Sequence, residues 1–343
     1  MAIKIAFYNH KGGVSKTTSV FHIGWKLAEM GCKVLLVDAD SQCNLTLLAL
    51  GIVQFEKYYK NNPLDNIKDA LTPAFKAQTH LIKPVDCLTI RDNLYLLPGH
   101  IDLASYEIQL GFSFQLNSFG TMQNLPGSFS YLFDKTANKY SADYILIDLN
   151  PSISAINQDL VLSSDFFIIP TSPDYFSLMA IKSLSNVLPQ WETWAINARK
   201  TFSDAVYPFP QNKPKFLGYT VNNYNIRNGE PANAPQSVMT EIDATINTSL
   251  IPQLKKADLL LDLENYGDTF CLGQISNFNS LMQKSQKAGV PVFNLSAEDL
   301  GTGGSVLEVE QKSVANFNNT FFGMAKKINT MVGHAISDSA ISA

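Results

Sequence analysis

The sequence is poor in the residues that build metal cages and disulfide frameworks. Its four cysteines, Cys32, Cys43, Cys87 and Cys271, are widely spaced and include no Cys-x-x-Cys pair, and its five histidines are equally dispersed. Structural zinc sites and disulfide-rich domains need such residues at close, regular spacing. The sequence therefore predicts neither kind of site.

Positive charge is limited and is carried almost entirely by lysine. Arginine occurs three times, as Arg91, Arg199 and Arg227, in a chain of net charge −4 and pI near 5.7. Guanidinium groups make the bidentate contacts that recognise phosphates and bases. A surface that is basic throughout is excluded, so any contact with nucleic acid has to come from a local lysine patch.

Long apolar runs are also missing. No stretch approaches the roughly 20 residues that span a bilayer, and the N-terminal residues read as a strand instead of a signal peptide. We therefore expect a cytoplasmic location. The 343 residues, 45% of them hydrophobic, are enough for one large domain with a sizeable core.

The N-terminal region alternates strand and helix patterns. An apolar run at Ala2–Tyr8 leads into a Gly-containing turn at Asn9–Ser15, a helical pattern at Thr17–Met30 and a second apolar run at Lys33–Val37. This order is a βαβ unit. It predicts an α/β fold with a mostly parallel, twisted sheet and helices on both faces.

Similar patterns continue along the chain. Further strands are expected at Leu94–Leu97, Tyr144–Ile147, Phe166–Ile169, Phe216–Val221 and Val290–Phe293, and long helices at Tyr175–Ala198 and Val314–Val332. We expect a single domain over residues 1–336, with an inserted elaboration at about 52–140. A flexible polar tail is expected at 337–343.

The turn after the first strand has the composition of a phosphate-binding loop. A strand, a Gly-rich turn and a helix aim backbone N–H groups at an anion. Here Gly12 and Gly13 permit close approach, Lys16 would contact the β- and γ-phosphates, and Thr17 would bind Mg²⁺. The strict pattern G-x-x-x-x-G-K-[ST] is not met, because His10 and Ser15 stand at its glycine positions. A βα turn that merely contains these residues is the alternative.

The string Lys11-Gly12-Gly13-Val14-Ser15-Lys16-Thr17-Thr18 resembles the deviant Walker A motif of the ParA/MinD family. In that family the first lysine reaches the partner's phosphates across an ATP-bound dimer, and the resemblance implies this role for Lys11. It also implies ATP and Mg²⁺ as cofactors and a homodimer in the ATP state. The family usually has glycine where Ser15 stands. A serine at this position fits the loop if its backbone angles are helical. Its presence in place of glycine is expected to affect the rate of ATP hydrolysis.

Three aspartates follow strands. The segment around Asp38 and Asp40 resembles the family's D-x-D-x-Q segment, which implies that Asp40 orients water and the Mg²⁺ shell and that Asp38 supports it. Residues 144–151 resemble a Walker B strand that ends at Asp148, a ligand of Mg²⁺ through water. The alternative for Asp38 and Asp40 is a turn or helix cap before Gln42–Leu50.

The segment Gly218–Arg227 resembles the family's base-reading strand and loop, which makes Asn222 the candidate for adenine recognition. A turn-forming role is the alternative.

Together these features predict an ATPase that acts as a slow, partner-stimulated dimerisation switch of ParA type, used to partition or position DNA or protein cargo. A MinD-like membrane-associated ATPase and a metabolic ATP-dependent enzyme of the same fold are the alternatives. Non-specific DNA binding would use lysines, whereas membrane binding by the closing helix is not expected. The candidate lysines are Lys255, Lys256, Lys284, Lys287, Lys326 and Lys327.

Overall fold

An eight-stranded sheet organises the molecule, in the order β10-β7-β6-β1-β5-β2-β4-β3. Strand β3 runs antiparallel to β4, and the other ladders of the sheet are parallel. The computed structural model describes residues 1–61, 63–115, 122–227, 230, 231 and 233–341. The predicted α/β fold is confirmed.

The strands of this sheet are β1 (Ile3–Phe7), β2 (Val34–Asp38), β3 (Leu88–Arg91), β4 (Leu94–Leu97), β5 (Tyr144–Asp148), β6 (Phe166–Thr171), β7 (Lys215–Tyr224) and β10 (Cys271–Ser276). A separate small hairpin joins β8 (Ile226–Arg227) and β9 (Glu230–Pro231). The α-helices are α1 (Lys16–Glu29), α2 (Asn44–Lys60), α3 (Ile67–Phe75), α4 (Glu107–Gln115), α5 (Ser128–Tyr140), α6 (Ala155–Leu162), α7 (Tyr175–Thr201), α8 (Asn233–Thr245), α9 (Ile251–Lys256), α10 (Ser280–Ala288), α11 (Ala297–Leu300) and α12 (Gly304–Ile341). Short helical turns lie at η1 (Ile101–Tyr106), η2 (Ile246–Leu250), η3 (Leu263–Tyr266) and η4 (Val292–Asn294).

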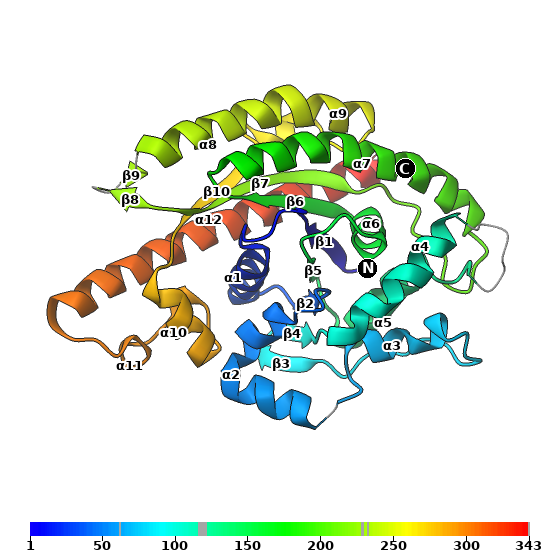
Figure 1. The fold of residues 1–343 in the computed structure, drawn as a ribbon, viewed down its shortest axis with the longest axis horizontal. Helices are drawn as coiled ribbons and strands as arrows, with labels where there is room; N and C mark the ends of the chain where they lie inside the picture. Colours follow the sequence, from blue (N-terminus) through cyan, green and yellow to red (C-terminus); the bar gives the residue numbers. More distant parts are fainter. Residues whose placement is uncertain (62, 116–121, 228–229, 232, 342–343) are drawn as a thin grey trace.

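Helices cover both faces of the sheet (Figure 1). Helices α1 and α12 pack against each other on one face, while α7 and α8 pack together on the other. Helix α1 lies very close to the strands, because a β-carbon at Gly24 would stand 2.5 Å from Leu36 Cδ2. The central strands are buried on both sides, which explains their continuous apolar runs.

The strands expected at 94–97, 144–147, 166–169 and 216–221 are confirmed. The one expected at Val290–Phe293 is wrong, since η4 lies there and the last strand is β10. Among the described strands β10 pairs only with β7, and only Leu272 and Ile275 of its six residues are buried, so its sequence lacks a continuous apolar run. A glycine such as Gly273 usually weakens a strand. Here a β-carbon at Gly273 would lie 2.5 Å from Met324 Cγ, so glycine permits α12 to pack closely on β10.

The closing helix is longer than the pattern indicated. Helix α12 begins at Gly304 and ends at Ile341, so residues 337–341 of the expected tail are helical. Residues 342–343 lie outside the described part of the chain, and the flexibility of the tail stays a prediction. Phe317, Phe321, Ile328 and Val332 are buried, as the helical spacing predicted.

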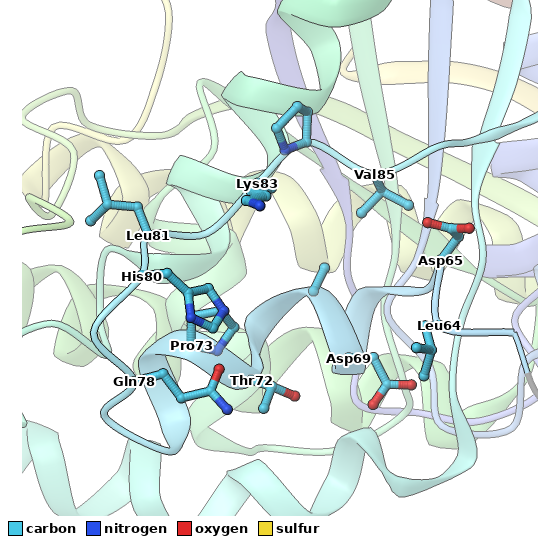
Figure 2. A pocket seen from close by; sticks show the side chains of 12 residues that line it. Leu64, Asp65, Asp69, Thr72, Pro73, Gln78, His80, Leu81, Lys83 and Val85 are labelled. Carbon is cyan, nitrogen blue, oxygen red and sulfur yellow. The ribbon is translucent and has the colours of Figure 1, made fainter.

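The region at 52–140 extends the main sheet. Strand β4 pairs with β2, and β3 pairs with β4 at the sheet edge. Residues 116–121 of this region lie outside the described residues. A hollow of about 490 Å³ lies between α3 and the segment that follows it. In Figure 2, Asp69 and Thr72 lie on one side of this hollow and Lys83 on the other. All its lining residues come from positions 64–85, so this hollow is separate from the predicted nucleotide site.

Candidate nucleotide-binding site

The register of three strands brings the predicted site together. Phe7 of β1 pairs with Asp148 of β5, and Asp148 pairs with Asp38 of β2. These parallel strands therefore end at one level of the sheet. The loop 8–15, which follows β1, lies beside the two carboxylates at that edge, where ligands of open α/β sheets bind.

The loop has an unusual backbone at Ser15. This residue has φ 60° and ψ 36°, the left-handed conformation, immediately before α1. Our sequence interpretation required helical angles for a serine here, and that requirement is not met. The left-handed region costs a non-glycine residue roughly 1–2 kcal/mol. This conformation gives a physical reason for a glycine at this position.

Three asparagines hold the loop in place. Asn9 accepts from the Lys11 N–H at 3.0 Å and donates to the Pro170 carbonyl at 2.8 Å. Asn222 donates to the Val14 carbonyl at 2.7 Å, and Asn223 donates to the Ser15 hydroxyl at 2.8 Å. The loop is thereby fixed to β6 and β7 on its outer side.

The structure places Asn222 behind the loop, fully buried. Its Oδ1 lacks a hydrogen-bond partner among the described residues. Its adenine-reading role stays a prediction, because the amide nitrogen already serves the loop. Asn9 and Asn223 were missed in the sequence, where single asparagines in turns carry no distinguishing signal.

Lys16 folds back over the loop. Its ammonium donates to the carbonyls of Asn9 at 2.9 Å and Lys11 at 3.2 Å. Burial lowers the pKa of Lys16 to about 8, against the opposing effect of the Asp148 and Asp40 charges. Lys16 is thus a desolvated cation at the loop, suited to bind a phosphate.

Asp148 is the feature that best fits a metal ion. Its carboxylate is buried, and neither oxygen has a hydrogen bond of acceptable geometry within the described chain. Burial raises the pKa of Asp148 well above its usual range. The charge on Asp38 adds to this, while Thr17 and Lys16 oppose it. Buried, unpaired carboxylate oxygens are costly unless they gain a cation or a proton.

The donor set suits Mg²⁺. Thr17, Asp40 and Asp148 offer hard oxygen donors, which this ion prefers. The described residues contain no group of three or more His, Cys, Asp or Glu that could hold a metal alone. Mg²⁺ commonly completes its shell with water and substrate phosphates, so such a site is consistent with a nucleotide-bound ion.

Asp38 and Asp40 have different surroundings. Asp38 accepts from the Thr46 N–H at 2.8 Å and from its hydroxyl at 2.6 Å, so it satisfies a free N–H in the first turn of α2. Burial raises its pKa to about 7. Asp40 accepts from the Gln42 N–H at 2.9 Å. It also lines a hollow beside the phosphate loop. Asp38 thus makes the contact expected of a helix cap. The contact of Asp40 with Gln42 is a turn contact, and the part of Asp40 in catalysis stays a prediction.

That hollow has a volume of about 410 Å³. The residues around it are Gly12, Gly13, Val14, Ser15, Lys16, Thr17, Thr18, Asp40, Gln42, Asn44, Leu48, Pro151, Asn223, Met282 and Gln286. Met282 and Gln286 come from α10, which no sequence motif connected with the site. A second hollow of about 680 Å³ is lined by Tyr224, which adjoins Asn223, and by Leu281, which adjoins Met282. The two hollows are therefore lined by consecutive residues at these two places, although no single residue lines both.

Lys11 is oriented away from its own hollow. Its Nζ lies 2.6 Å from Asp174 Oδ2, and Lys11 is not among the described residues that line the hollow. Asp174 also caps α7 by accepting from the Ser177 N–H at 3.0 Å. The two lysines of the motif thus have different contacts. Lys16 donates to carbonyls of the loop, whereas Lys11 forms an ion pair with Asp174.

The candidate DNA-binding lysines do not form one free patch. Lys284 is paired with Glu310 at 2.6 Å, and Lys327 donates to the Cys271 carbonyl at 2.9 Å. Lys255 and Lys256 lie at the end of α9, far from α10 in Figure 1. DNA binding through these residues stays a prediction.

A strand, a phosphate loop, a helix and two in-register carboxylates define the chain as a P-loop nucleotide-binding protein. A model of the family described as AAA domain matches residues 2–198, which is more than half of the chain. The chain therefore belongs to this family, and within it to the ParA/MinD type of P-loop ATPase.

Two relatives illustrate the similarity. An uncharacterized protein of Methanocaldococcus jannaschii is 26% identical over 297 residues, covering 87% of this chain and 93% of the relative. Chromosome partitioning protein ParA of Caulobacter vibrioides is 27% identical over 189 residues, covering 54% of this chain and 61% of the relative. The chain thus spans less than two thirds of the length of that ParA.

Solved structures share the fold. A Cyanothece McdA(D38A)–ATP complex matches with a TM-score of 0.58 and 15% identity, covering 93% of this chain and 97% of that chain. The septum site-determining protein MinD of Pyrococcus horikoshii, complexed with Mg-ADP, matches with a TM-score of 0.50 and 17% identity, covering 98% and 99%. In the part of our chain that is described, no helix has the length and apolarity to cross a membrane.

Proposed function

We propose that this chain is an ATP-binding and ATP-hydrolysing dimerisation switch of ParA type, which partitions or positions DNA or protein cargo. The observation that carries the proposal is the contrast between its two motif lysines. Lys16 lies at its own phosphate loop, whereas Lys11 points away from its own hollow toward Asp174. The pair with Asp174 holds Lys11 outside its own hollow, and once that pair opens Lys11 would contact the phosphates of a second subunit.

The residues of the chain divide the work of hydrolysis. Backbone N–H groups of the loop and Lys16 bind the phosphates, and Asp40 orients the attacking water. Thr17 and Asp148 would hold Mg²⁺, which neutralises phosphate charge when it is bound. Closure of a second subunit would add Lys11 and exclude water. Loss of the γ-phosphate would weaken that bridge, so the nucleotide state sets the dimer population.

The base of the nucleotide fits best in the 680 Å³ hollow. Its wall adjoins the phosphate hollow through consecutive residues of β7 and α10. The lining is rich in amides, including Asn225, Asn277 and Asn279. Amide groups can pair with the edge of a base.

Calorimetric titration of the protein with ATPγS and Mg²⁺, combined with an ATPase assay, tests the enzymatic part. Wild type should bind one nucleotide per chain and hydrolyse ATP slowly. Lys16→Ala should lose most of the affinity, whereas Lys76→Ala, an exposed lysine beyond the site, should behave as wild type. Hydrolysis that persists in Lys16→Ala, or absence of nucleotide binding in wild type, would contradict the proposal.

A further inference from the structure

The end of β7 contacts the phosphate loop at three consecutive residues. Asn222 donates to the carbonyl of Val14, and Asn223 donates to the carbonyl of Gly13 at 3.1 Å and to the hydroxyl of Ser15 at 2.8 Å. Consecutive strand residues normally point to opposite faces. Two adjacent amides that reach one loop therefore need a local irregularity in the strand.

That irregularity is a bulge at Asn223. Asn222 pairs with Ile275 of β10 and Tyr224 pairs with Ser276, so Asn223 is the extra residue between them. Its backbone is left-handed, with φ 64°. Bulges re-aim side chains and occur next to active sites. Here the bulge turns the Asn223 amide onto Ser15, which is itself left-handed.

The same segment forms the wall of the amide-rich hollow. Tyr224 and Asn225 line it, and the Tyr224 carbonyl accepts from the Asn277 N–H at 2.9 Å across the sheet edge. The residue that contacts Ser15, Asn223, and the first residue of this wall, Tyr224, are therefore consecutive in the chain.

We propose that Asn223 is a positioning residue that couples occupation of the 680 Å³ hollow to the conformation of the phosphate loop, acting through the Ser15 hydroxyl. The inference rests on the proposed nucleotide function. It adds a reason for the chain to bind a complete nucleotide more tightly than phosphates alone. Ser15 and Asn223, two non-glycine residues in left-handed conformations, are joined by a hydrogen bond between their side chains. Small movements at one are thus transmitted to the other.

The test is a calorimetric titration in the presence of Mg²⁺ with two probes, ATPγS and inorganic tripolyphosphate. Asn223→Gly removes the amide and keeps a residue that tolerates φ 64°, and Ser15→Gly removes the hydroxyl in the same way. Asn93→Gly is the matched control, because Asn93 also has φ 64° but lies in the turn between β3 and β4. Circular dichroism melting verifies that each variant is folded.

Wild type should prefer ATPγS, and Asn223→Gly should reduce this preference by at least about threefold, the effect of one hydrogen bond. Ser15→Gly should reduce it similarly, and the double variant should be no worse than either single one. Equal weakening of both probes, an unchanged ratio, or no preference in wild type would overturn the coupling. Wild type that binds neither probe would instead contradict the proposed function itself.

Discussion

Lys11 and Asp174 form an ion pair at the outer side of the phosphate loop, with Nζ and Oδ2 2.6 Å apart. Asp174 belongs to the start of α7, so the pair joins the loop to the helix that follows β6. The Lys11 side chain is 18% exposed and that of Asp174 is 40% exposed. For Lys11 to reach another subunit's phosphates, this pair has to break.

Asp174→Asn should therefore favour the dimer. Asparagine caps a helix as well as aspartate, so the bond to Ser177 is kept while the counter-ion of Lys11 is removed. A half-exposed ion pair is worth up to about 1 kcal/mol, and a symmetric dimer breaks two of them. We expect the ATPγS-bound dimer to tighten about fivefold or more, measured by analytical ultracentrifugation. An unchanged or weaker dimer would show that the pair does not restrain Lys11.

Asp148→Asn should remove the dependence of nucleotide affinity on Mg²⁺ while leaving the stability of the fold nearly unchanged. Because burial raises the pKa of Asp148 well above its usual range, the charged carboxylate is disfavoured at this position, and an amide of the same shape carries no charge to bury. Unliganded stability should change by less than about 1 kcal/mol. ATPγS affinity should be higher with Mg²⁺ than with EDTA for wild type, and equal under both conditions for the variant. A variant that keeps the Mg²⁺ advantage would remove Asp148 from the metal site.

His22 should make the fold sensitive to acid. Its Nδ1–H donates to the Thr18 carbonyl, its Nε2 accepts from the Val292 N–H, and burial lowers its pKa to about 3. The unfolded chain binds this proton below the ordinary pKa of 6.5, so stability is full above that pH and falls toward acid. At pH 5 the loss is roughly 2 kcal/mol.

The variant for this prediction is His22→Phe, which keeps a ring between Phe278 and Phe321. It should be less stable than wild type at pH 7, because Val292 N–H loses its acceptor, by about 1–3 kcal/mol. Denaturant unfolding at both pH values should show this deficit shrinking by roughly 2 kcal/mol at pH 5. Parallel pH profiles for the two proteins would contradict the account of His22.

Gly24→Ala should destabilise the contact between α1 and the sheet. The added methyl group would lie 2.5 Å from Leu36 Cδ2 and 3.3 Å from Leu146 Cδ1, within the core. Overpacking of this kind costs about 1–3 kcal/mol. Gly323→Ala on α12 is the control, because a β-carbon there meets no atom within 4 Å and should stabilise the helix by about 0.5–1 kcal/mol. Equal effects in thermal unfolding would contradict the packing argument.

The fold was largely predictable because buried parallel strands leave continuous apolar runs. The sequence of β5, Tyr-Ile-Leu-Ile-Asp, shows such a run, and the strand is buried along its whole length. Strand β10 lies at the edge of the described sheet, and only two of its six residues are buried, so its sequence carried no comparable signal. The 3₁₀ turn at η4 contains the same residue types as a strand, and tertiary packing decided its conformation.

The candidate site was predictable where a motif is local. The loop 11–18 and the aspartates at strand ends could be located, and the sheet register brings Asp38 and Asp148 side by side. The partners Asn9, Asn223 and Asp174 could not be found, because their contacts join segments that are far apart in sequence or depend on backbone angles. The left-handed angles of Ser15 likewise depend on the folded loop.

The most direct measurement of the central claim is molecular mass in solution by size-exclusion chromatography with light scattering. Wild type, Lys11→Ala and the control Lys76→Ala would each be measured with Mg²⁺ and ATPγS, with Mg²⁺ and ADP, and without nucleotide. For wild type and the control, the account predicts a dimer only in the presence of Mg²⁺ and ATPγS. For Lys11→Ala it predicts a monomer under all three conditions. A wild-type chain that stays monomeric with ATPγS, or a dimer indifferent to nucleotide and to Lys11, would contradict it.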